Sequence, residues 1–95
     1  MASVGEALIN ACNTGQAREV QRLLSGGADV DGVVQGGWTS LIVASQNGQV
    51  EIVDMLLAAQ AAVNAANDEG CTALYRASFR GHHVIVQRLL ASGTC

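Results

Sequence analysis

Residues 37–60, GWTSLIVASQNGQVEIVDMLLAAQ, match the stretches 33 residues before and after them without a gap. The positions that recur in all three copies carry small or apolar residues. They are Leu8, Leu41 and Leu74; Ala11, Ala44 and Ala77; Gly15, Gly48 and Gly81; Val20, Val53 and Val86; and the pairs 23–24, 56–57 and 89–90, all Leu-Leu. A fixed period in this range is typical of a solenoid, in which one structural unit is stacked several times.

Each copy predicts two short helices joined by a tight connection. Apolar residues recur at the i, i+3, i+4 spacing of an amphipathic helix, as in Val20, Leu23 and Leu24. The predicted helices run from Ser3 to about Asn13 and over 16–25, 40–47, 50–59, 73–80 and 83–92, with extended, hairpin-like loops at 28–38 and 61–71. Such helices are too short to be stable alone, and only a neighbouring pair can cover the apolar face of each pair. We therefore expect an all-α fold, an α-solenoid of three stacked helix pairs.

Composition narrows the function classes. The 95 residues are expected to form one domain. A net charge of −3 and the lack of any lysine argue against nucleic-acid binding, which needs a basic face. The apolar runs are too short to insert into a membrane, and the N-terminus lacks the pattern of a signal peptide. Three cysteines without CxxC spacing predict free thiols in a reducing compartment, the cytoplasm, with the nucleus also compatible.

The recurring pattern resembles that of the ankyrin-repeat family over nearly the whole chain. The middle copy matches the family at Gly37, Thr39, Leu41, Ala44, Gly48, Ile52, Val53, Leu56, Leu57, Val63 and Asn64. The resemblance implies a helix-turn-helix solenoid with repeats of about 1–33, 34–66 and 67–95. It also implies non-catalytic, intracellular protein–protein interaction, as in a scaffold, through a concave face built from the loop tips and the first helix of each repeat.

The chain departs from the family pattern at three kinds of position. Ser40 and Ala73 replace its proline, and Ile42 and Tyr75 replace its histidine. Gln60 stands where the family has the glycine that ends the second helix, so we expect Gln60 to adopt a left-handed backbone conformation.

No residue pattern predicts catalysis, a metal or a cofactor. Neighbouring helical residues point about 100° apart, so His82 and His83 are poorly placed to share one ion, and His82 matches a structural position of the family. Cys71 lacks an orienting third group or oxyanion site that would make it a nucleophile with either histidine. We expect no enzyme activity, no metal site and no cofactor.

The resemblance places the partner-binding face across the first loop tip and the ends of the first helices. The expected residues are Gln35, Trp38, Gln46, Asn47, Asp68, Glu69, Cys71, Tyr75, Phe79 and Arg80. Trp38, placed at a hairpin tip, and Phe79 would be apolar anchors, because aromatic residues dominate binding energy at interfaces. Alternatively, Trp38 packs on the adjacent hairpin. Arg76, Arg80 and Arg88 form either a solubilising surface or a site for an acidic peptide.

Two function hypotheses follow. The first is binding of another protein through the concave face. The alternative is a structural role, as an end piece of a longer ankyrin array or as a stack that pairs with itself. For the alternative, the last helix would form a homodimer through Val84, Ile85, Val86, Leu89 and Leu90, which no following repeat covers.

Overall fold

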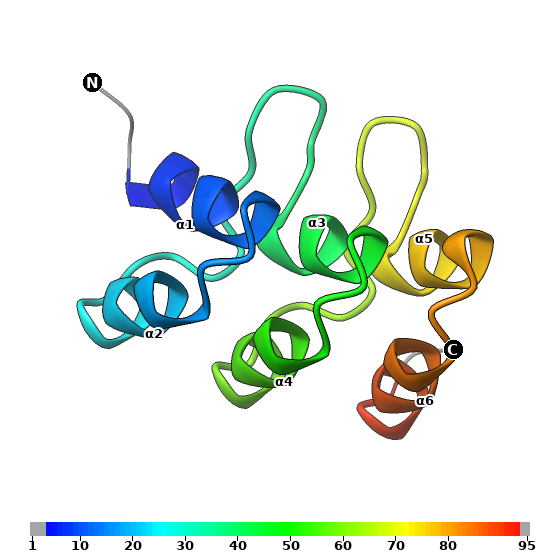
Figure 1. The fold of residues 1–95 in the computed structure, drawn as a ribbon. Coiled ribbons are helices and arrows are strands. Elements are labelled where there is room, and N and C mark those ends of the chain that lie inside the picture. The colour runs from blue at the N-terminus through cyan, green and yellow to red at the C-terminus, as the bar shows by residue number, and fades with distance from the viewer. Residues whose placement is uncertain (1–3, 94–95) are drawn as a thin grey trace.

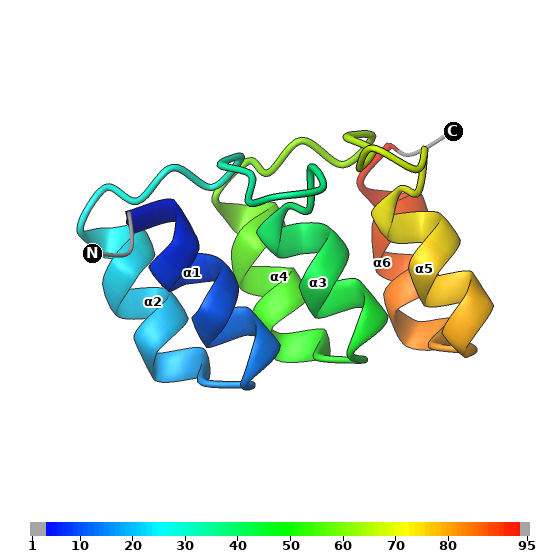
Figure 2. The ribbon, with the colours of Figure 1, turned by 90° about the horizontal axis from the view of Figure 1, so that it is seen from above.

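The computed structural model describes residues 4–93, with side chains from Glu6 onward. Six helices follow one another in three pairs: α1 (Val4–Asn13) with α2 (Ala17–Ser25), α3 (Ser40–Gln46) with α4 (Val50–Ala58), and α5 (Ala73–Arg80) with α6 (His83–Ala91). The first helices α1, α3 and α5 form one row and α2, α4 and α6 a second row, and the two long loops project from the first row (Figure 1). Seen from above, the two helices of each pair run antiparallel (Figure 2). The predicted all-α solenoid is confirmed.

Threonine caps begin α3 and α5, and a residue with a left-handed backbone follows α4. The backbone N–H groups of Ile42 and Tyr75 donate hydrogen bonds to the Oγ1 atoms of Thr39 and Thr72, at 3.2 and 3.1 Å, so each threonine caps its helix. Gln60 has φ 66° and is the one non-glycine residue with positive φ among the described residues, which confirms the expected left-handed conformation. The predicted start of the first helix at Ser3 lies outside the described residues.

The two long loops are hairpin-like and lie side by side. Val33 pairs with Thr39, and Ala66 with Thr72, each as an isolated antiparallel bridge. The backbone N–H of Asp68 donates a 2.8 Å hydrogen bond to the carbonyl of Gly36, which ties the second loop to the first. The loops are therefore held in one surface with the first helices.

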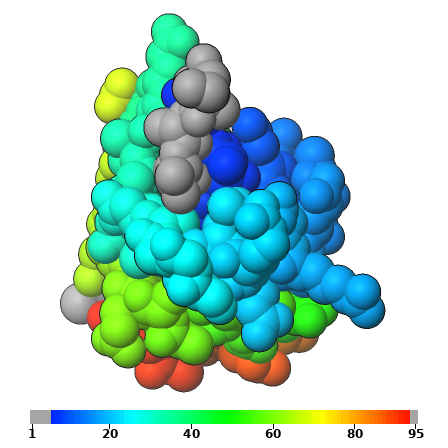
Figure 3. All heavy atoms as spheres, turned by 90° about the vertical axis from the view of Figure 1, so that its left-hand side faces the viewer, coloured from blue at the N-terminus to red at the C-terminus, as the bar shows by residue number. Residues whose placement is uncertain are grey.

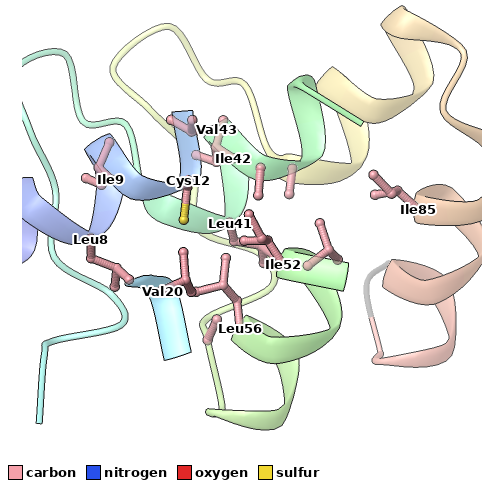
Figure 4. Packing of buried hydrophobic residues seen from close by; sticks show 14 of the residues in the cluster. Leu8, Ile9, Cys12, Val20, Leu41, Ile42, Val43, Ile52, Leu56 and Ile85 are labelled. Atoms are coloured by element: carbon pink, nitrogen blue, oxygen red, sulfur yellow. The ribbon is translucent and has the colours of Figure 1, made fainter. Parts of the chain in front are cut away.

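The core lies between the two helix rows. Its members interdigitate from neighbouring pairs, as Val20, Leu41, Ile52 and Leu56 do in Figure 4. Cys12 lies in the same cluster and is fully buried, and this burial raises the pKa of its thiol from 9.0 to about 11, although the nearby Ser40 hydroxyl partly offsets the rise. The core is continuous through all three pairs.

The two ends of the stack differ in polarity. The first pair, α1 and α2, and the first loop form one end of the stack (Figure 3), and in this pair the polar residues Asn10 and Arg18 are exposed. In the last pair, Leu90 of α6 is 51% exposed. The expectation for the last helix was wrong in part, because Ile85 and Leu89 are fully buried against the rest of the core and Val86 is half-buried.

Candidate functional site

Four side chains form a continuous line of contacts across the second and third helix pairs. The guanidinium carbon of Arg76 lies 5.9 Å from the ring centroid of Trp38 and 5.2 Å from that of Phe79. The Phe79 ring in turn stacks on Tyr75, with 6.2 Å between centroids. Contacts of this kind between a cation and an aromatic ring are attractive within about 6 Å. Arg76 thus links Trp38, at the end of the first loop, to the aromatic pair on α5.

Gln46 fixes the arginine from the neighbouring pair. The Nε of Arg76 donates a 2.8 Å hydrogen bond to the side-chain oxygen of Gln46. The Nε2 of His82 lies 2.9 Å from the Gln46 carbonyl and donates to it. Both contacts join the second and third pairs, so α3 and α5 hold these side chains in a fixed relation. We call Trp38, Gln46, Tyr75, Arg76 and Phe79 together the aromatic face.

Exposure separates the supporting members of this face from the accessible ones. Phe79 is 67% and Tyr75 52% exposed, although both are large aromatic side chains. Trp38 is half-buried and packs against the core cluster. The tip of the first loop is the turn over 34–37, closed by a 2.9 Å bond from Gly37 N–H to the Val34 carbonyl, and Trp38 follows it. Trp38 therefore lies directly after the turn at the loop tip, and its ring contacts the Arg76 guanidinium.

The other predicted residues lie around the aromatic face. Gln35, Asp68 and Glu69 are exposed at the loop tips, and half-buried Cys71 lies where the second loop enters α5. Arg80 is exposed at the far end of α5. Asn47 is exposed at the end of α3, where its side-chain nitrogen donates a 3.2 Å hydrogen bond to the Asn13 side chain.

Sequence reasoning did not place Arg76 in the site. The structure makes it the central member, because three of the other four residues contact it. A signal was present, since Arg76 and Phe79 are three residues apart on one helix and such residues are neighbours on its surface. The contact with Trp38 crosses between helix pairs and has no local signal.

Among the described residues, no group of three or more His, Cys, Asp or Glu side chains could hold a metal ion. None of the described helices is long and apolar enough to cross a membrane. His82 is engaged by the Gln46 carbonyl and contributes to packing between the pairs.

A family model described as ankyrin repeats, in three copies, matches residues 8–95. A comparison with individually curated proteins finds no match. Ankyrin repeats are general protein–protein interaction modules, and members of the family are typically non-catalytic. The match extends over most of the chain and agrees with three stacked helix pairs, so this chain belongs to the ankyrin-repeat family.

Proposed function

We propose that this chain binds another protein through the aromatic face, with the loop tips and Arg80 at its margin. The observation that carries the proposal is the pair of exposed rings, Phe79 and Tyr75, on a helix whose other side is buried at Ala73 and Ala77. Large exposed aromatic residues are typical anchors of interfaces. Because packed helices hold these rings, binding requires little ordering of the surface.

The margin of the face carries separated charges. Asp68 and Glu69 are exposed at the tip of the second loop, and Arg80 lies at the opposite end of α5. Rim charges of this kind tune the association rate and specificity more than the affinity. Gln35, Asn47 and Cys71 complete the margin as polar contacts.

The test compares Phe79→Ala with Leu90→Ala. Both remove a large side chain that is more than half exposed, but only Phe79 lies on the aromatic face. A partner captured by the wild-type chain should bind Phe79→Ala more weakly by about 2 kcal/mol or more, and bind Leu90→Ala unchanged. Equal binding of all three proteins, with intact helical signals, would reject the aromatic face as the binding site.

Trp38→Ala then tests whether Trp38 contacts the partner directly or only supports the other residues of the aromatic face. Because Trp38 is half-buried and packs on the core and on Arg76, its removal should lower the melting temperature as well as the affinity. A loss of affinity with an unchanged melting temperature would make Trp38 a direct contact residue. Both quantities are measured on the same preparation.

The second candidate is self-association through the open side of the third pair. The exposed Leu90 on α6 favours it. Against it, residues 71–95 contain three arginines and no acidic residue, so two such ends placed together would repel each other. Sedimentation velocity of the wild-type chain and of Leu90→Glu decides between a dimer that the substitution dissociates and a monomer in both cases.

A further inference from the structure

The guanidinium of Arg76 has a free edge. Arginine carries five N–H donors in a planar fork. Among the described residues only its Nε is hydrogen-bonded, to Gln46, and the two terminal nitrogens have no hydrogen-bond partner there. A carboxylate binds such an edge through two parallel hydrogen bonds. Arg76 therefore keeps the part of its side chain that is best suited to recognise a carboxylate.

The surroundings orient this edge before any ligand arrives. The contacts with Trp38 and Phe79 and the bond to Gln46 restrict the guanidinium of Arg76, which is a half-buried residue. A free arginine side chain would lose rotamer entropy on binding, and a restricted one loses less. Arg76 is therefore less mobile than a typical surface arginine before a carboxylate binds.

The charge distribution favours an acidic ligand. From residue 71 to the end of the sequence the charged residues are Arg76, Arg80 and Arg88, whereas all eight acidic residues precede it. Arg88 is paired with Asp54 at 2.7 Å on the second row of helices. Arg76 and Arg80 remain on α5, one turn apart, beside the exposed rings. Asp68 and Glu69 lie at the loop tip and would repel a carboxylate placed there.

We propose that the partner presents an acidic segment to the aromatic face. The carboxylate of an internal Asp or Glu side chain is bound by the two terminal nitrogens of Arg76, and an apolar side chain of the same segment covers Phe79 and Tyr75. Arg80 attracts further acidic residues of the segment, away from Asp68 and Glu69. This assignment rests on the proposed function, because it specifies the chemistry of the partner at the same face.

The experiment selects binders from a phage-displayed library of random 12-residue peptides on the wild-type chain. Selected peptides should be enriched in Asp and Glu close to an apolar residue. The best peptide is then synthesised with an amidated C-terminus and titrated against Arg76→Lys, Arg76→Gln and Arg22→Gln. Arg22 is the matched control, because it is an exposed arginine on α2 that pairs with Glu19. Fluorescence of Trp38, the single tryptophan of the chain, reports binding.

Loss of the charged fork should weaken binding by about 10- to 100-fold for Arg76→Gln, and Arg22→Gln should leave it unchanged. Arg76→Lys keeps the charge and should recover only part of the affinity, because lysine lacks the planar fork. Melting curves check that each variant is folded. A synthetic peptide with each acidic residue replaced by Asn or Gln should bind as weakly as Arg76→Gln does.

The outcomes separate the two proposals. Selected peptides without acidic enrichment, yet weakened by Phe79→Ala, would overturn the carboxylate assignment and support binding at the face. Acidic peptides that bind Arg76→Gln as well as the wild type, or that require a free C-terminal carboxylate, would also overturn it. A library that yields no binder to the folded chain would count against both proposals.

Discussion

Hydrogen bonds join the helix pairs at both junctions: Asn47 with Asn13 at the first, and Gln46 with both Arg76 and His82 at the second. The two junctions differ at one equivalent position. Gln49 and His82 occupy the same position in consecutive pairs. His82 donates to the Gln46 carbonyl at 2.9 Å, but the side-chain oxygen of Gln49 is buried without a hydrogen-bond partner in the described structure. The same position is thus satisfied at one junction and unsatisfied at the other.

The burial of apolar side chains at equivalent positions decreases from the first pair to the third. Ile9 and Ile42 are 5% and 1% exposed, but Tyr75 at the equivalent position is 52% exposed. The first two are covered by the following pair, and within the described residues nothing covers the third. As apolar burial decreases toward the third pair, contacts such as Arg76 with Gln46 hold that pair in place. The exposure of Tyr75 in the aromatic face follows from this change.

The largest effect is expected from a side chain that both junctions share. Leu56 on α4 is fully buried, and α4 packs against α2 and α6. Leu56→Ala should cost about 2–5 kcal/mol of unfolding free energy, because it leaves a cavity in the core. Leu90→Ala, at a position that is 51% exposed, is the control and should cost much less. Equal urea midpoints for the two variants would show that the core does not couple the pairs as described.

The apolar packing at the first junction can be tested through Cys12, which is buried there. Its pKa is raised to about 11 in the folded chain, so between pH 9 and 11 the unfolded chain loses a proton that the folded chain keeps. Stability from this group is therefore complete below pH 9 and falls as pH rises toward 11, by up to about 2 kcal/mol. Urea unfolding in the presence of a reductant, compared with Cys12→Ala, isolates this dependence. A decline of the same size in both proteins would exclude Cys12 as its source.

The second junction can be tested by two glycine substitutions with nearly the same backbone cost. Gly48 and Gly81 have φ 75° and 77°, so alanine at either is strained by about 1–2 kcal/mol. A Cβ at Gly48 would lie 2.7 Å from the His82 ring, whereas a Cβ at Gly81 meets no described atom within 4 Å. Gly48→Ala should cost about 1 kcal/mol more than Gly81→Ala, because it disturbs the His82 hydrogen bond. Equal melting temperatures would show that this contact adds nothing to the junction.

The sequence was sufficient for the helices and their stacking because the evidence for them is periodic or local, and the resemblance to the ankyrin family suggested most residues of the candidate site. Most of the repeated apolar positions lie in or against the core, with Leu90 as an exposed exception, and the place of Gln60 in the pattern predicted its backbone conformation. What the sequence did not show depends on contacts between pairs. Arg76 reaches Gln46 and Trp38 in the neighbouring pair, and Ile85 is buried by packing that its own helix does not reveal.

The smallest expected effect is also the most specific, and it asks whether the first junction can be given the polar contact of the second. Gln49→His places at the first junction the residue type that His82 provides at the second. The Asn13 carbonyl is equivalent to the Gln46 carbonyl, and Gln49 already lies close to Gly15 as His82 does to Gly48.

The substitution should stabilise the chain by about 0.5–1.5 kcal/mol, because it removes a buried oxygen without a partner and adds a hydrogen bond. Gln16→His is the matched control, since Gln16 holds the equivalent position in the first pair and is exposed. Thermal melts of both variants measure the difference. A stabilisation of equal size in both would attribute it to histidine itself, whereas a loss of stability in Gln49→His alone would show that the first junction packs too tightly around Gly15 for the ring to enter.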